Sequence, residues 1–384
     1  MVEAVRGGES QRTVAKRFGC GLGTVQRALR RAGDRPLSEV DWTDQPPIAG
    51  RVRRTNVELE NLVLDIRRVL RHESILGEYG PAAIRRELEG HPAVPGPPPA
   101  VRTIARILER RGALDARRRI RHRAPPPGWY LPQVRERRVE LDSFDVISGL
   151  RLLGGIDLDV LTGISLHGGL AAAWPTSGVT AKLTVASLDE HWREVGRPGY
   201  AQFDNDTRFI GGMSQPNSIG PVIRYCLAVS VVPVFAPPQE TGFQAAIEAF
   251  NGRWQQKLWA RAWMPTVPDA QARSAAYIAA SRLRAAARIE AAPDRTPFPL
   301  DRLIDLTAPP LGRLVFLRRT SDQGRVSVLG LRYPVDRRWI HRLVRAELDL
   351  DERRLRFFAL RRREPEDQPL LGEVPFEPPA RWYR

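Results

Sequence analysis

Cysteine, lysine and long apolar runs are scarce in this chain of 384 residues. Its two cysteines, Cys20 and Cys226, cannot form a disulfide framework or the Cys/His cluster of a zinc knuckle. The longest apolar stretch, 226–238, is interrupted by Pro233 and is too short to span a bilayer. No hydrophobic segment typical of a secretory signal is present near Met1. With 42% apolar and 27% charged residues, these absences predict a globular, cytoplasmic protein that is not associated with a membrane.

Basic residues are abundant and unevenly distributed. The net charge is +16, and because the chain has only three lysines, arginine supplies 57 of its 60 basic residues. Base composition of the gene can favour arginine, so the distribution is more informative than the total. Residues 1–130 carry a net +10, residues 131–260 a net −2, and residues 261–384 a net +8. Two basic flanks around a slightly acidic centre predict a polyanionic partner and a central carboxylate site.

Residues 1–40 contain a pattern typical of a helix-turn-helix. Ser10 is placed to cap a first helix, and a second helix is predicted to open at Thr24 and end at Gly33, with Val25, Ala28 and Leu29 inward. Its outward residues would then face the major groove of double-stranded DNA, where Arg and Gln recognise base edges. These residues are Thr24, Gln26, Arg27, Arg30 and Arg31. A small helical hairpin with a solvated basic face is the alternative.

A second helical module is predicted over 55–115. It comprises a long amphipathic helix from Val57, a helix at 79–90, and a third helix at 101–112 whose apolar residues are Ile104, Ile107 and Leu108. Arg102 and Arg106 are predicted to be exposed and to contact DNA, as in a second helix-turn-helix. Any basic three-helix bundle would show the same pattern.

Residues 130–290 predict an α/β domain. Three strands are expected within 138–174, followed by a helix to Gly196, a strand at 199–209, a helix at 219–230, a strand at 231–238 and a long helix at 242–263. This order predicts a mixed five-stranded sheet covered by helices, as in an RNase H-like core. The prolines at 41–50, 116–128 and 291–312 predict connectors between the modules.

Three acidic residues occupy positions where such a core could gather them. Asp142 lies in the first strand, Asp204 at the end of the fourth, and Glu248 on a polar stripe of the long helix. A carboxylate inside a strand is unfavourable unless it is paired or binds a cation. Hard oxygen ligands suit Mg²⁺ or Mn²⁺, and two such ions could activate a phosphodiester. Any single acid is more often a solvated group, and other acids also lie near strands: Asp145, Asp157, Asp159 and Asp206.

Several short motifs resemble those of DDE transposases and retroviral-type integrases. QFDNDTRF at 202–209 is similar to their Asp-Asn-Gly strand end, and PPQETGFQAAIEAFNGRWQ at 237–255 is similar to their entry into the catalytic helix. VELDSF at 139–144 resembles their first strand. The preceding helical modules resemble those of bacterial insertion-sequence transposases.

The resemblance implies that Asp142, Asp204 and Glu248 are catalytic carboxylates that bind two Mg²⁺ or Mn²⁺ ions. Asp206 replaces the usual glycine, which leaves Asp206 as an alternative to Asp204. The spacing of 44 residues between Asp204 and Glu248 is longer than is usual in the family, and Glu240 is the alternative to Glu248.

Residues 310–362 predict short strands that would form a small SH3-like barrel, a fold also familiar after the core in this family. Its arginines, including Arg325, Arg332, Arg337 and Arg338, could grip DNA, although a docking or dimerisation role is the alternative. The basic helix at 271–293 is predicted to follow phosphates. The acidic, proline-rich tail after residue 364 is predicted to be disordered.

Together these features predict a DNA transposase or integrase that cleaves and joins DNA strands without a covalent enzyme–DNA intermediate. It would work as a homo-oligomer on DNA, because two element ends must be joined, and would be nucleoid-associated when bound. A non-catalytic DNA-binding regulator derived from a transposase is the main alternative. A metal-dependent nuclease that releases cut ends is a third.

Overall fold

The computed structural model describes residues 1–43, 55–113, 126–212, 216–299 and 304–379. The chain divides into two compact units, 1–61 and 62–384. The greater part of each predicted connector, 41–50 and 116–128, lies outside the described residues. Among the helices that are described, none combines the length and the apolar character needed to cross a membrane.

The first unit contains three short helices, α1 (Val2–Arg6), α2 (Gln11–Arg17) and α3 (Leu22–Ala32). Ser10 caps α2 as predicted, its Oγ accepting the Thr13 amide at 3.2 Å. Helix α3 begins at Leu22, two residues before the predicted start at Thr24, because Gly21 occupies the N-cap position. Val14 of α2 and Val25 of α3 are fully buried in one cluster, so the two helices pack across the intervening turn.

The second helical module consists of α4 (Val57–Glu73), α5 (Pro81–Leu88) and α6 (Val101–Arg110). The apolar face predicted for the third helix is confirmed, since Ile104, Ile107 and Leu108 are all buried. Pro81 occupies the first turn of α5, where its missing amide hydrogen costs no hydrogen bond.

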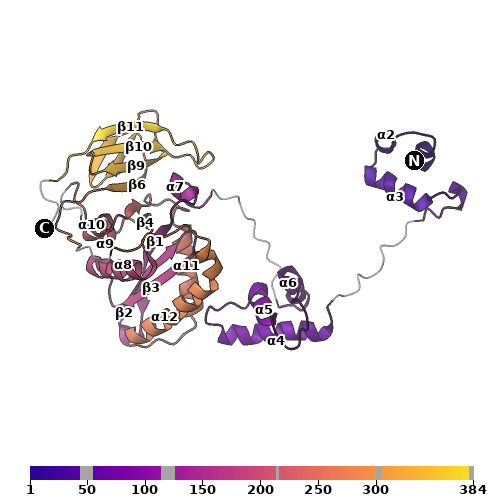
Figure 1. The fold of residues 1–384 in the computed structure, drawn as a ribbon, viewed down its shortest axis with the longest axis horizontal. Helices are drawn as coiled ribbons and strands as arrows, with labels where there is room; N and C mark the ends of the chain where they lie inside the picture. Colours follow the sequence, from indigo (N-terminus) through magenta and orange to yellow (C-terminus); the bar gives the residue numbers. More distant parts are fainter. Residues whose placement is uncertain (44–54, 114–125, 213–215, 300–303, 380–384) are drawn as a thin grey trace. The chain divides into compact units, whose positions relative to one another are not determined.

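A mixed sheet with helices on both faces forms the core, in agreement with an RNase H-like fold (Figure 1). Strands β1 to β3 are antiparallel, whereas β4 and β5 join the sheet in parallel on the other side of β1. The strands are β1 (Leu141–Arg151), β2 (Asp157–Ser165), β3 (Ala171–Thr176), β4 (Tyr200–Phe203) and β5 (Val232–Phe235). The order β3-β2-β1-β4-β5 places the carboxyl ends of β4 and β5 side by side.

Two groups of helices cover the two faces of this sheet. Phe144 of β1 packs in a cluster with Trp192 of α8 and Val222 of α10, whereas Ile147 packs in another with Ile247 and Trp254 of α11. The helices of the core are α7 (Pro132–Arg135), α8 (Ala181–Val195), α9 (Thr207–Ile210), α10 (Pro221–Ala228), α11 (Ala245–Trp254), α12 (Val267–Arg284) and α13 (Ala286–Glu290). A π-helical turn, Gln255–Trp259, continues α11.

The C-terminal strands correct the prediction of a separate SH3-like barrel. Strand β6 pairs in parallel with β5, in the register Val234 to Val315 and Phe235 to Phe316. Nine of the described strands therefore form one sheet in the order β11-β10-β9-β6-β5-β4-β1-β2-β3. Strands β7 and β8 pair with each other in a separate two-stranded sheet. The strands are β6 (Arg313–Arg319), β7 (Arg325–Val328), β8 (Leu331–Pro334), β9 (Leu343–Asp349), β10 (Arg354–Ala359) and β11 (Leu370–Pro375).

The physical reason is the composition of β6. Residues Leu314 to Leu317 are all buried, so both faces of this strand are covered. A strand with two buried faces belongs in the interior of a sheet that is packed on both sides, whereas a strand of a small barrel has one face in solvent.

The tail is more ordered than predicted, and part of the predicted connector before β6 packs on the core. Leu370–Pro375 forms β11, which pairs with β10, and Phe376 after it is buried. Within the connector, Thr296 forms a β-bridge with Arg197, and Phe298 is buried. Acidic, proline-rich composition therefore overestimated disorder in the tail.

Phe316 tests whether the C-terminal strands and the core form one cooperative unit. Its fully buried ring stacks on Phe235 at a centroid distance of 5.3 Å. We expect Phe316→Ala to lower the free energy of unfolding by about 3–5 kcal/mol. In denaturant, the unfolding transitions of the core and of the C-terminal strands should shift together, by the same amount. Leu370→Ala, at a half-exposed position, is the control. Separate transitions, with the core unaffected, would support an independent C-terminal domain.

Candidate active site

The alternation of side chains along β1 separates two nearby carboxylates. Asp142 has the same parity as Phe144, which packs toward α8, whereas Asp145 has the same parity as Ile147, which packs toward α11. Because successive side chains of a strand point to opposite faces, two residues three apart cannot share a face. The structure thus places Asp142 and Asp145 on different sides of the sheet.

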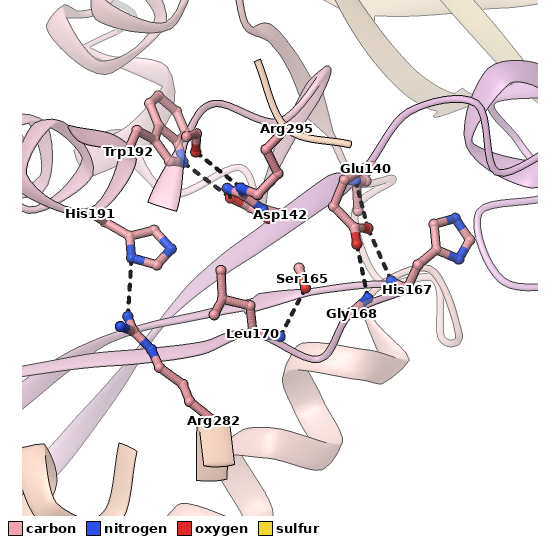
Figure 2. Close-up of polar contacts among 12 residues, drawn as sticks. Glu140, Asp142, Ser165, His167, Gly168, Leu170, His191, Trp192, Arg282 and Arg295 are labelled. Carbon is pink, nitrogen blue, oxygen red and sulfur yellow. Dashed lines mark hydrogen bonds and ion pairs between the residues drawn. The ribbon is translucent and has the colours of Figure 1, made fainter. Parts of the chain in front are cut away.

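Asp142 is engaged in a buried ion pair. Its carboxylate accepts two hydrogen bonds from Arg295, from Nη1 to Oδ1 at 3.0 Å and from Nη2 to Oδ2 at 2.6 Å, and a third from Trp192 Nε1 at 3.1 Å (Figure 2). Only 1% of Asp142 is exposed. Burial opposes its ionisation, but the Arg295 guanidinium outweighs burial and holds the pKa of Asp142 below its usual value.

His191 completes the surroundings of this ion pair. Burial lowers the pKa of His191 to about 4, although the Asp142 charge acts in the opposite direction, so the imidazole is neutral at pH 7. Figure 2 shows its ring beside Arg282, with Nδ1 at 3.4 Å from Nη2. The prediction that Asp142 lies with Asp204 and Glu248 is therefore corrected, because Asp142 faces α8 and is occupied by Arg295.

Asp145, and not Asp142, lies on the face of β1 toward α11, the helix that carries Glu248. The pKa of Asp145 is raised to about 6, mainly by burial and also by the charges of Asp204 and Glu248, whereas the Val146 amide and Arg208 act in the opposite direction. The charges of Asp204 and Glu248 thus both act on Asp145. Sequence reasoning set Asp145 aside, because spacing alone does not tell which face of β1 the helix of Glu248 covers.

Asn251 fixes the orientation of the Asp145 carboxylate. Its Nδ2 donates to Asp145 Oδ2 at 2.8 Å, and its Oδ1 accepts from Thr162 Oγ1 at 2.8 Å. The Thr162 hydroxyl also lies 3.0 Å from the Asp145 carbonyl oxygen. Asn251 lies one helical turn after Glu248 on α11, so this network ties β1 and β2 to the helix that carries Glu248.

Asp204, and not Asp206, is the free carboxylate at the end of β4. Asp206 caps α9 by accepting the Arg208 amide at 2.8 Å, and it binds the Arg208 guanidinium through Nε at 2.9 Å and Nη2 at 2.6 Å. Asp204 is half-buried and accepts the Asp206 amide at 3.0 Å. Burial and the nearby Asp206 charge raise the pKa of Asp204.

Glu248, and not Glu240, is the available glutamate. Glu240 forms ion pairs with Arg319 of β6 and, at 3.5 Å, with Arg362. Glu248 lies exposed in the first turn of α11. The acids left for chemistry are therefore Asp145, Asp204 and Glu248.

These acids fit a divalent cation in donor chemistry and charge. They supply hard oxygen atoms, and a divalent ion would stabilise the ionised form of Asp145, which burial and the charges of Asp204 and Glu248 disfavour. In the part of the chain that the structure describes, however, no three His, Cys, Asp or Glu side chains are gathered closely enough to enclose a metal ion. The three acids therefore match a divalent cation in donor atoms and charge, and not in the spacing of their side chains.

The predicted DNA-contacting residues lie on α3 and α6. Gln26, Arg27 and Arg30 are exposed, whereas Thr24 and Arg31 are half-buried. Arg31 donates to the Thr43 carbonyl, which reduces its freedom. Arg102 and Arg106 of α6 are exposed. The exposure predicted for Thr24 and Arg31 is thus only partly observed, and the role of all these residues in binding DNA stays a prediction.

Comparison with known proteins gives distant structural matches. No protein-family model and no curated protein matches the chain. At 12% identity it is similar to the HTLV-2 integrase catalytic core domain in complex with magnesium, with a TM-score of 0.23 over 29% of this chain and 64% of that one. It is also similar to the simian T-cell lymphotropic virus intasome (12%, TM-score 0.30, 70% and 84%) and to the BIV integrase catalytic core (12%, TM-score 0.26, 36% and 81%). At these scores the matches carry no functional argument.

Asp142 is expected to act in stability. Asp142→Asn leaves Arg295 buried without a counter-charge, so we expect a loss of about 3 kcal/mol in the free energy of unfolding. Asp157→Asn is the matched control, since Asp157 is 73% exposed and pairs with the exposed Arg151; its loss should stay below about 0.5 kcal/mol. Equal effects of the two variants in urea denaturation would contradict the structural assignment of Asp142.

Asp145 is expected to have the opposite effect on stability. The pKa of Asp145 is raised in the folded chain to about 6. Its protonated form therefore stabilises the fold fully below pH 4, and this stabilisation is lost as the pH rises through 6. Without divalent ions, Asp145→Asn should therefore gain up to about 3 kcal/mol relative to wild type between pH 4 and pH 7. Urea denaturation at several pH values measures this difference, and a difference that does not change with pH would show that Asp145 ionises normally.

Proposed function

We propose that this protein is a metal-dependent polynucleotidyl transferase of the transposase or integrase type, which cleaves DNA and joins the freed end to a target. The proposal is supported by the hydrogen bond of 2.8 Å between Asp145 and Asn251, which lies one turn after Glu248 on α11, and by the charges of Asp204 and Glu248 that raise the pKa of Asp145. These acids come from β1, the end of β4 and α11, which are far apart in the chain. A half-buried carboxylate whose pKa is raised by burial and by neighbouring acids is unfavourable for stability, as is typical of a site built for chemistry.

In this proposal the three acids hold Mg²⁺ or Mn²⁺, with two ions expected. When bound, the ions would activate the attacking oxygen and stabilise the leaving oxygen of a phosphodiester. Asn251 and Thr162 hold the Asp145 carboxylate in one orientation. Arg208 keeps Asp206 out of the ligand set by binding both of its oxygens.

DNA recognition is assigned to the helical modules. The exposed side chains of Gln26, Arg27 and Arg30 are of the types that recognise base edges, and Arg102 and Arg106 would contact a second segment of DNA. The net charge of +10 over residues 1–130 supports binding to phosphates. Joining two DNA ends would require more than one copy of the chain.

A strand-cleavage and strand-transfer assay tests this function. We expect Mg²⁺- or Mn²⁺-dependent products with wild type, and a loss of at least about 10³-fold in Asp145→Asn, Asp204→Asn and Glu248→Gln, because each removes a ligand charge. Asp157→Asn should retain full activity. Binding to DNA by all variants should match wild type, which separates chemistry from recognition. DNA from the flanks of the gene is the first substrate.

Two outcomes would change the assignment. Tight DNA binding without any metal-dependent product would favour a non-catalytic regulator. Cut ends that are released and never joined would favour a nuclease. Full activity in Asp145→Asn would refute the proposed ligand set, whichever reaction is observed.

A further inference from the structure

Arg318 is a buried cation next to the proposed site. It lies near the end of β6, is only 7% exposed, and burial lowers its pKa to about 10. Within the described residues no carboxylate contributes to that pKa. A buried guanidinium without a counter-ion is unfavourable and persists only where its hydrogen bonds matter.

The hydrogen bonds of Arg318 converge on the end of β4. Its Nη2 donates to Asn205 Oδ1 at 2.8 Å, and its Nη1 donates to the Ala236 carbonyl at 3.3 Å. Asn205 Nδ2 donates to the same Ala236 carbonyl at 2.6 Å. The Arg318 guanidinium, the Asn205 side chain and the Ala236 carbonyl, which directly follows β5, are thus linked in a ring of three hydrogen bonds.

The rest of the guanidinium is anchored within the C-terminal strands. Arg318 Nε donates to the Ser327 carbonyl at 3.0 Å, and Arg318 Nη1 donates to the Leu317 carbonyl at 2.8 Å. The group also lies 5.2 Å from the centre of the Phe316 ring. Arg318 therefore joins β6 and β7 to the residue that follows Asp204.

We propose that Arg318 is a positioning residue, which fixes the Asp204 carboxylate through Asn205. This inference rests on the proposed function of Asp204. Asn205 stands between Asp204 and Asp206, and the Asp206 amide donates to Asp204 Oδ1 at 3.0 Å. Holding Asn205 therefore holds the short turn that orients Asp204. Arg318 does not act on Asp204 through its charge, because the charges that shift the pKa of Asp204 are those of Asp206 and Arg208.

The test compares Arg318→Met and Arg318→Lys, with Arg313→Met as the control. Arg313 is an exposed arginine at the other end of β6. We expect Arg318→Met to lower kcat by about 100-fold, because a displacement of about 1 Å is enough for that loss, with KM for DNA within about twofold of wild type. Arg318→Lys should recover part of kcat, and Arg313→Met should match wild type.

Amide hydrogen exchange gives a readout that does not depend on activity. The Asp206 amide should exchange at least about tenfold faster in Arg318→Met, after correction for global stability, because its acceptor is no longer held. Should this variant not fold, Asn205→Ala removes the same contact from the other side and should give the same acceleration. Unchanged exchange at Asp206 in the folded variants would overturn the inference, as would a raised KM with unchanged kcat, which would assign Arg318 to DNA binding.

The two proposals can fail separately. Faster exchange at Asp206 in a protein without strand-transfer activity would keep the positioning of Asp204 and refute the proposed function. If the wild type is active and the Asp206 amide exchanges at the same rate in wild type and in Arg318→Met, the proposed function stands and the positioning role of Arg318 is refuted.

Discussion

The alternation of side chains along β1 places two carboxylates, three residues apart, in opposite electrostatic environments. On the face toward α8, Asp142 meets Arg295 and Trp192, and its ionised form is stabilised. On the face toward α11, burial and the charges of Asp204 and Glu248 disfavour the ionised form of Asp145. One strand therefore contributes a paired anion to one side of the sheet and the proposed metal-binding carboxylate to the other. The arrangement of the candidate site follows from this separation.

The C-terminal strands take part in building that site. Strand β6 pairs with β5, and its last two residues contact the site region, Arg318 through Asn205 and Arg319 through Glu240. Pairing with Arg319 also removes Glu240 from the set of free carboxylates. The segment that was predicted to be an appended DNA-binding barrel thus supports the strand ends where Asp204 lies.

Local features of the fold were predictable because neighbouring residues determine them. The Ser10 cap, the apolar face of α6 and the succession of strands and helices along the core follow from side-chain patterns over short windows. The choice between Asp142 and Asp145 was not predictable in this way, since it depends on Arg295, which lies 153 residues along the chain. The pairing of β5 with β6 is equally non-local. The buried composition of residues 314–317 was nevertheless a readable signal for an interior strand.

The uninterrupted sheet has a consequence for how this protein can change during evolution. Appended domains are exchanged between genes with little disturbance, because few contacts cross their boundaries. Here such an exchange after β5 would uncover the edge of β5 and the ring of Phe235, which stacks on Phe316. The second half of the gene is therefore expected to be inherited together with the core as a single piece.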